Sequence, residues 1–190
     1  SFLINSKIRK SVKKLKKTKK KFSLDNIKLI TNKIDFELTK DQLKAINEIN
    51  VDLRSEQKMF RLLQGDVGSG KTIVALTSIL NVINSKFQVA FMAPTEILAQ
   101  QHYTLAKNLL PDNVKIDILT SKTDNKIRKK IINDLENHQI DLLIGTHSLF
   151  QNKINYRKLG LIIIDEQHKF GVKQRKKLSD KGGKNCDILV

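Results

Sequence analysis

The sequence predicts an α/β fold, in which a doubly wound, mainly parallel sheet carries helices on both faces. Three observations lead to this prediction. Segments of strand and helix character alternate from residue 60 onward, as a parallel sheet with crossover helices requires. Strand candidates such as residues 161–164 are continuously apolar, which is typical of strands buried on both faces. A glycine-rich loop joins the first strand candidate to the first helix of the series and is typical of phosphate-binding α/β folds.

Apolar spacing and cap residues define the individual elements. The expected strands are residues 60–64, 88–92, 114–119, 140–144, 159–164 and 187–190. The expected helices of the alternating region are residues 71–81, 95–109 and 125–137. Upstream, apolar residues at helical spacing predict a short helix within 23–34, and Thr39 is a suitable N-cap for a second helix. We therefore expect a basic, partly helical connector over residues 1–35 and one α/β domain over residues 36–190.

Composition narrows the class of protein. The chain has 190 residues, enough for one well-buried core, and a formal net charge of +17. Such an excess of positive charge indicates a polyanionic partner, and nucleic acid is favoured over a membrane because no apolar run is long enough to span a bilayer. A soluble, cytoplasmic protein is expected. The first residue is Ser1, so we expect the sequence to begin inside a longer protein.

Cysteine and histidine usage predicts neither a disulfide nor a structural metal site. Cys186 is the single cysteine, and we expect it to be a small buried residue at the start of the last strand. The histidines lack the spacing of zinc ligands. They are His102, His138, His147 and His168. His102 and His138 are expected to be solvated or satisfied polar residues.

The strongest charge run lies near the start of the chain. Residues 7–21 contain ten Lys or Arg and no acidic residue, with few large apolar side chains among them. This segment is expected to bury little. It is interpreted either as a solvated linker or as a segment that contacts phosphates directly.

A phosphate-binding loop is the most specific motif of the sequence. Residues 65–72, GDVGSGKT, fit the pattern G-x-x-x-x-G-K-S/T between a predicted strand and a predicted helix. Its glycines allow backbone N–H groups to point at phosphate oxygens, and the helix adds its positive end. Lys71 is expected to reach the β- and γ-phosphates of ATP, and Thr72 to bind Mg²⁺. Other residues of this loop are also expected to contact the nucleotide: Gly65, Gly68, Ser69 and Gly70.

A second acidic motif completes the predicted ATP site. Asp165 and Glu166 follow the apolar strand 159–164. An acid at the carboxyl end of a parallel strand is suitably placed to hold Mg²⁺, so Asp165 is the predicted metal ligand. Glu166 is the predicted general base or water-orienting residue. Alone this pair could cap a helix, but with the loop at Lys71 it predicts a Mg–ATP site.

The acidic motif continues as Asp165-Glu166-Gln167-His168, and together with the phosphate loop it resembles superfamily 2 helicases. The resemblance implies RecA-like architecture and ATP-driven movement on nucleic acid. It implies that Gln167 and His168 couple the ATP site to the nucleic-acid path. It also implies that Gln42, in residues 36–42, reads adenine; Phe36 either stacks on that base or belongs to the core.

Further blocks resemble the helicase motifs that contact the nucleic-acid backbone. These blocks are residues 93–102, APTEILAQQH, and residues 145–149, GTHSL. The exposed N-terminus of the helix after Thr95 is also a physically suitable phosphate site. The implied nucleic-acid contacts are Pro94, Thr95, Glu96, Gln100, Thr120, Gly145, Thr146 and His147.

Among these helicases the sequence is most similar to the bacterial RecG family. The similarity lies in residues 62–72, 92–96 and 165–175 and covers the chain from about Phe36 to Val190. It implies an ATP-dependent DNA helicase that acts on branched or forked DNA without sequence preference, in recombination, repair and stalled-fork processing. RecG proteins also contain a second RecA-like domain with an arginine finger and a wedge domain. We expect both to lie outside this sequence, so the isolated chain should hydrolyse ATP poorly.

Two other functions remain open from the sequence. The chain could be a non-catalytic, basic nucleotide- or nucleic-acid-binding remnant of a split helicase gene. It could also be the related motor of a transcription-repair coupling factor. Two basic features have simpler interpretations: Arg61 is expected to be a surface charge beside the first strand, and the lysines and arginine of residues 126–130 to form the solvent face of a helix.

Overall fold

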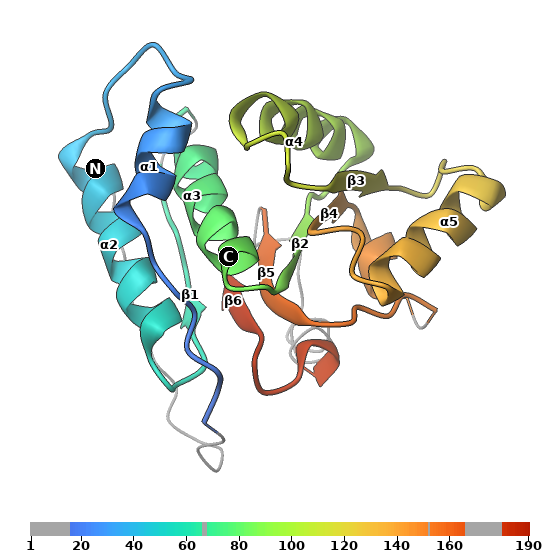
Figure 1. Cartoon of the computed structure of the whole chain (residues 1–190). Coiled ribbons are helices and arrows are strands. Elements are labelled where there is room, and N and C mark those ends of the chain that lie inside the picture. Colours follow the sequence, from blue (N-terminus) through green and yellow to red (C-terminus); the bar gives the residue numbers. More distant parts are fainter. Residues whose placement is uncertain (1–15, 66–67, 152, 166–179) are drawn as a thin grey trace.

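The computed structural model describes residues 16–65, 68–151, 153–165 and 180–190, which form one six-stranded sheet (Figure 1). The spatial order of the strands is β1-β6-β5-β2-β4-β3, and every pair is parallel. The strands are β1 (Phe60–Arg61), β2 (Gln88–Met92), β3 (Ile116–Leu119), β4 (Leu142–Gly145), β5 (Leu159–Ile164) and β6 (Asp187–Leu189). Because all strands run the same way, all their carboxyl ends lie at one edge of the sheet.

Helices cover both faces of this sheet. They are α1 (Leu24–Thr31), α2 (Lys40–Arg54), α3 (Lys71–Asn84), α4 (Glu96–Leu109), α5 (Asn125–Glu136) and the 3-10 helix η1 (His147–Phe150). Helices α3 and α4 pack directly on one face, and α1 and α2 form an outer layer against α3 (Figure 1). Helix α5 and η1 lie on the other face. The predicted doubly wound α/β fold is confirmed.

The alternating side chains of the central strands build one apolar core on each face. Val89 and Phe91 of β2 point to the core under α3 and α4, whereas Ala90 and Met92 point to the core under α5 and η1. All residues of β2, β4, β5 and β6 are buried, which explains their continuously apolar sequences. None of the helices in the described part of the chain is long and apolar enough to cross a membrane.

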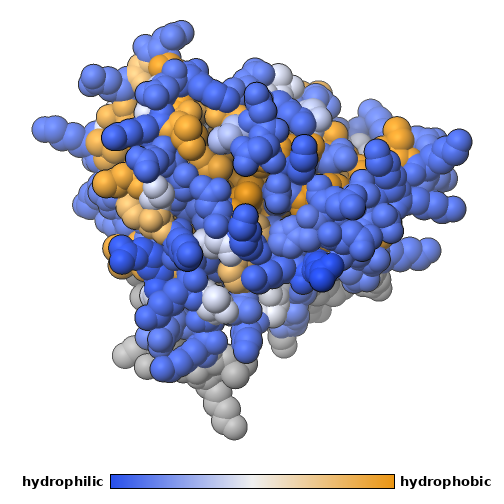
Figure 2. Space-filling view, viewed as in Figure 1, coloured by the Kyte–Doolittle hydropathy of each residue, from blue (hydrophilic) through white to orange (hydrophobic). Residues whose placement is uncertain are grey.

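The outer surface is mainly hydrophilic, with one apolar region (Figure 2). Apolar side chains reach the surface at the left of that view, over the outer helices. Leu24 and Leu29 of α1 are exposed, as is Val51 of α2. The basic side chains of α5 are mainly solvated, as expected for Lys126, Lys129 and Lys130.

All six predicted strands are present, although the two edge strands are shorter than expected. Strand β1 covers only Phe60–Arg61, and its chain continues beside β6 through the hydrogen bond from Leu63 N to Val190 O. Strand β3 begins at Ile116 because its pairing with β4 begins there. Cys186 is fully buried directly before β6, as predicted, and burial raises the pKa of its thiol to about 12.

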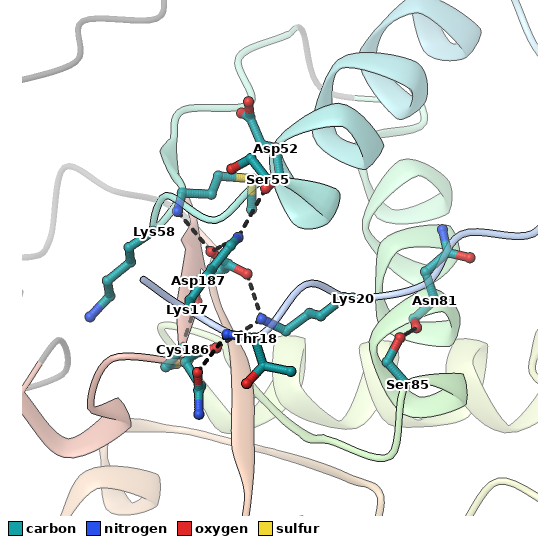
Figure 3. Close-up of polar contacts among 12 residues, drawn as sticks. Lys17, Thr18, Lys20, Asp52, Ser55, Lys58, Asn81, Ser85, Cys186 and Asp187 are labelled. Carbon is teal, nitrogen blue, oxygen red and sulfur yellow. Dashed lines mark hydrogen bonds and ion pairs between the residues drawn. The ribbon is translucent and has the colours of Figure 1, made fainter. Parts of the chain in front are cut away.

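The basic segment before α1 departs from the prediction, because two of its lysines are buried. Residues 16–22 run as an extended strap, which hydrogen-bonds through Lys17 N to Glu56 O and through Lys20 N to Leu53 O. The side chains of Lys17 and Lys20 are fully buried and converge on Asp187, each at 2.6 Å (Figure 3). The expectation of a segment that buries little is wrong for these two residues. The remainder of the charge run, residues 1–15, lies outside the described residues.

Asp187 accounts for this burial, because its carboxylate is itself buried and needs partners. It accepts hydrogen bonds from Lys17 Nζ, Lys20 Nζ and the Met59 N–H. Lys17 also donates to Asp52 O, and Lys20 to Asn185 O. Burial lowers the pKa of Lys17, and the charge of Asp187 partly opposes that shift. The strap therefore joins the end of α2, the start of β1 and the start of β6.

We expect Asp187→Asn to destabilise the chain by about 3–5 kcal/mol, because it leaves two buried ammonium groups without a counter-charge. Lys17→Met should cost clearly less, since Asp187 then keeps Lys20 as its ionic partner. Urea denaturation followed by circular dichroism measures both free energies of unfolding. Equal costs for the two variants would show that the buried charge balance at Asp187 does not hold the strap.

Candidate functional site

The phosphate loop connects β1 to α3 at the carboxyl edge of the sheet. Gly68 and Gly70 adopt left-handed backbone conformations, with φ of 79° and 81°. Gly70 is also the N-cap of α3, and its carbonyl accepts from Ile73 N and Val74 N. Glycine is the residue that takes this conformation with least strain. The loop thus reverses the chain tightly enough for α3 to begin at Lys71, as predicted; Asp66 and Val67 lie outside the described residues.

Gln42 braces this loop from the first turn of α2. Its Oε1 accepts from Thr39 N and the Thr39 hydroxyl accepts from Gln42 N, so the two residues form a capping box. Its Nε2 donates to Ser69 O at 2.9 Å, and its side chain is buried. A Cβ added to Gly70 would lie 2.1 Å from that Nε2. Gln42 therefore has a structural role in the loop, and its predicted pairing with adenine stays a prediction.

The side chains of the loop fit a nucleotide phosphate chain. Lys71 Nζ lies across the loop, 2.5 Å from Gly65 O, and the first N–H groups of α3 have no partners within the helix. Of the described residues, Ser69 is one of two with a buried side-chain N or O atom that lacks a hydrogen-bond partner. A buried hydroxyl of this kind can donate to a phosphate oxygen. Thr72 follows in the first turn of α3 and is half-buried.

Asp165 stands directly after β5 at the same edge. Its N–H donates to Met92 O at 2.8 Å, which continues the pairing of β5 with β2. Only β6 separates β5 from β1, so parallel pairing brings Asp165 and the loop to one side of the edge. The Asp165 side chain is 28% exposed. A hydroxyl at Thr72 and a carboxylate at Asp165 are the oxygen ligands that Mg²⁺ prefers. The predicted Glu166, Gln167 and His168 lie outside the described residues.

His102 contacts Asp165 and was not predicted as a site residue. Its Nε2 lies 2.8 Å from Asp165 Oδ2, and its ring stacks on Phe91 with centroids 4.5 Å apart. The two residues are 63 positions apart in sequence. The sequence gave no local signal for this contact, because it depends on how α4 crosses β2 and β5.

Phe36 is the predicted residue with the most open surroundings on the adenine side. It is 54% exposed and lies just before Thr39, the N-cap of α2. The alternative that it belongs to the core is therefore wrong. Its exposure leaves its ring available for stacking, which stays a prediction.

The predicted nucleic-acid contacts follow β2, β3 and β4, on the other half of the carboxyl edge. Thr95 is exposed and caps α4 by accepting from Leu98 N, and Gln100 and His147 are also exposed. Pro94 and Thr120 are half-buried. Glu96 accepts from Ser121 Oγ at 2.6 Å and pairs with Lys122, which lowers its pKa.

Two of these predicted contacts are inaccessible as side chains. Thr146 is 4% exposed, and its hydroxyl lies 3.3 Å from Ser148 Oγ. Gly145 is buried in β4, where an added Cβ would lie 1.9 Å from Leu119 O. The expectation that both residues contact nucleic acid directly is corrected accordingly: the side chain of Thr146 belongs to the fold, and Gly145 is required for the close approach of β3.

Arg61 is a second correction, because it is not a surface charge. Its guanidinium pairs with Glu48 at 2.7 Å and with Asp52 at 2.7 Å, and its side chain is 11% exposed. It ties β1, which leads into the phosphate loop, to α2. Together with Gln42, it makes α2 the support of the loop.

We expect Gly70→Ala to damage the loop more than its backbone strain alone would. Gly183 has φ of 62° with nothing near its missing Cβ, so Gly183→Ala is a matched control that carries the left-handed strain of roughly 1–2 kcal/mol only. Gly70→Ala must also displace Gln42 from Ser69 O, at a further cost of about 1 kcal/mol. Urea denaturation measures both costs, and equal destabilisation would contradict the bracing role of Gln42.

Comparisons with known proteins agree on one family. Residues 39–186 match the DEAD/DEAH box helicase family. The ATP-dependent DNA helicase RecG of Borreliella burgdorferi is 46% identical over 95% of this chain, and that of Streptococcus pneumoniae is 43% identical over 89%. The chain spans 26% and 25% of the length of these two relatives, about a quarter in each case.

Solved structures agree with these sequence relatives. A structure of RecG bound to a three-way DNA junction superposes with a TM-score of 0.81 at 41% identity, over 92% of this chain and 23% of that one. A DEAD box protein from Methanococcus jannaschii superposes with a TM-score of 0.67 at 22% identity, over 88% of this chain and 47% of that one, which shows a shared fold. The chain therefore belongs to the DEAD/DEAH box helicase family, as a helicase domain of the RecG type.

Proposed function

We propose that this chain is the ATP-binding motor domain of a RecG-type, ATP-dependent DNA helicase or translocase. The observation that carries the proposal is that parallel pairing brings the phosphate loop after β1 and Asp165 after β5 to one half of the carboxyl edge. Ligands of open α/β sheets bind outside this edge. Membership of the DEAD/DEAH box family implies ATP binding.

The proposed roles in the ATP site follow from chemistry. The loop N–H groups, Ser69 Oγ and the start of α3 bind phosphate oxygens, and Lys71 neutralises the β- and γ-phosphates. Thr72 and Asp165 hold Mg²⁺, which when bound neutralises charge on the transferred phosphoryl group. Glu166 orients the attacking water, and Gln167 and His168 connect this site to the nucleic-acid path. Phe36 and Gln42 receive the adenine.

DNA is the proposed polyanionic partner. The net charge of +17 suits a phosphate backbone, and no base-reading module is present in the sequence, so binding should not depend on base sequence. The exposed Thr95, Gln100 and His147 follow β2 and β4, beside the ATP half of the edge. One relative was solved with a three-way junction, which supports branched or forked DNA as substrate. Helicase action in recombination and repair is proposed for the whole protein to which this domain corresponds.

Lys71→Ala should abolish binding of Mg–ADP, because it removes the cation that lies within the phosphate loop. Lys44→Ala, at an exposed position on α2, carries the same charge change and should bind as the unsubstituted chain does. Fluorescence titration of a labelled ADP analogue measures the affinity. An unchanged affinity in Lys71→Ala would refute the proposed ATP site.

Thr95→Asp should weaken DNA binding without unfolding α4. Aspartate caps helices as well as threonine does, but its negative charge repels a phosphate at the helix N-terminus. Ser23→Asp makes the same change at the N-cap of α1 and serves as the control. Anisotropy of fluorescent forked DNA over a salt series measures affinity, whose salt slope falls by about 0.7–0.9 per lost phosphate contact. Equal affinities of the two variants would place the DNA elsewhere.

A further inference from the structure

His102 is held in place by two independent contacts. Its Nε2 lies 2.8 Å from Asp165 Oδ2, and its ring is stacked on Phe91 at an interplanar angle of 26°. Phe91 belongs to β2 and is buried. The stacking fixes the plane of the imidazole, and the hydrogen bond fixes the direction in which it points.

The hydrogen bond has a defined polarity. An ionised carboxylate can only accept, so the proton must lie on Nε2 of His102, which donates to Asp165. The side chain of His102 is 12% exposed and that of Asp165 is 28% exposed. Asp165 therefore keeps access to solvent at the same time as one of its oxygens is held from α4.

The origin of His102 in α4 matters for the geometry of the edge. Asp165 is fixed along the chain by the hydrogen bond from its N–H to Met92 O, but its side chain could still rotate. His102 limits that rotation from a helix that packs on β3 and β4, outside the ATP half of the sheet. Groups that bind metals through carboxylates are usually oriented by such partner hydrogen bonds.

We propose that His102 is a positioning residue for Mg²⁺: its Nε2–H holds one oxygen of Asp165 and so orients the carboxylate for the ion beside Thr72. The proposal rests on the proposed Mg–nucleotide site. A histidine that merely fills space beside Phe91 would stabilise the fold in the same way with or without Mg²⁺. The two roles differ in how substitutions change the Mg²⁺ dependence of nucleotide binding.

The test is a titration of Mg²⁺ against a fluorescent ADP analogue, and of the analogue alone in EDTA. In His102→Ala, the Mg²⁺ concentration that half-saturates the effect should rise about 10- to 100-fold, while affinity in EDTA stays unchanged. His102→Gln should restore most of the loss, because its Nε2 is the same number of bonds from Cβ. His102→Asn is one bond too short and should not. Gln101→Ala, an exposed neighbour on α4, is the control.

The outcomes separate the alternatives. An unchanged Mg²⁺ dependence in His102→Ala would overturn the role of His102, and so would failure of Gln to rescue in a variant with unchanged melting temperature. If the unsubstituted chain shows no Mg²⁺-dependent nucleotide binding, the proposed function itself fails and this role with it. Nitrogen-15 NMR of the nucleotide-free chain gives an independent signature: His102 should be protonated at Nε2, and an Nδ1-protonated ring would contradict the hydrogen bond.

Discussion

The position of β6 between β1 and β5 is the constraint on which the arrangement of the candidate site depends. The last strand of the chain enters the sheet between the strand that precedes the phosphate loop and the strand that precedes Asp165. Because all three are parallel, the loop and the acid end on the same edge. Strands β2, β4 and β3 continue the sheet on the other side of β5, so the predicted nucleic-acid residues occupy the adjacent half of that edge.

The opposite edge is fixed by charge as well as by apolar packing. Asp187 opens β6 in a fully buried position, and its carboxylate is acceptable there only because Lys17, Lys20 and the Met59 N–H contact it (Figure 3). The strap that supplies the two lysines also pairs with backbone carbonyls near the end of α2. Helix α2 in turn supports the phosphate loop through Gln42 and Arg61. Segments before the conserved-looking motifs thus take part in shaping the site.

Local patterns in the sequence predicted the fold and the main parts of the site. Continuous apolar runs located the strands, Thr39 and Thr95 located helix starts, and the loop pattern located the start of α3 at Lys71. The contacts that were missed join residues far apart in sequence. Lys17 and Lys20 looked solvated because their partner Asp187 is about 170 positions away. His102 looked like an ordinary polar residue of an amphipathic helix, and Thr146 looked exposed because its motif follows a strand.

A crystal structure of the chain with Mg²⁺ and ADP would test the proposed site most directly. We predict that the β-phosphate lies within the loop between Gly65 and Thr72, with Ser69 Oγ and backbone N–H groups as donors. The Mg²⁺ should lie between Thr72 Oγ1 and the Asp165 carboxylate, while His102 Nε2 keeps its contact with Oδ2. A nucleotide bound elsewhere, or a metal without Thr72 and Asp165 in its coordination sphere or hydrogen-bonded to its waters, would contradict the proposed ATP-binding function.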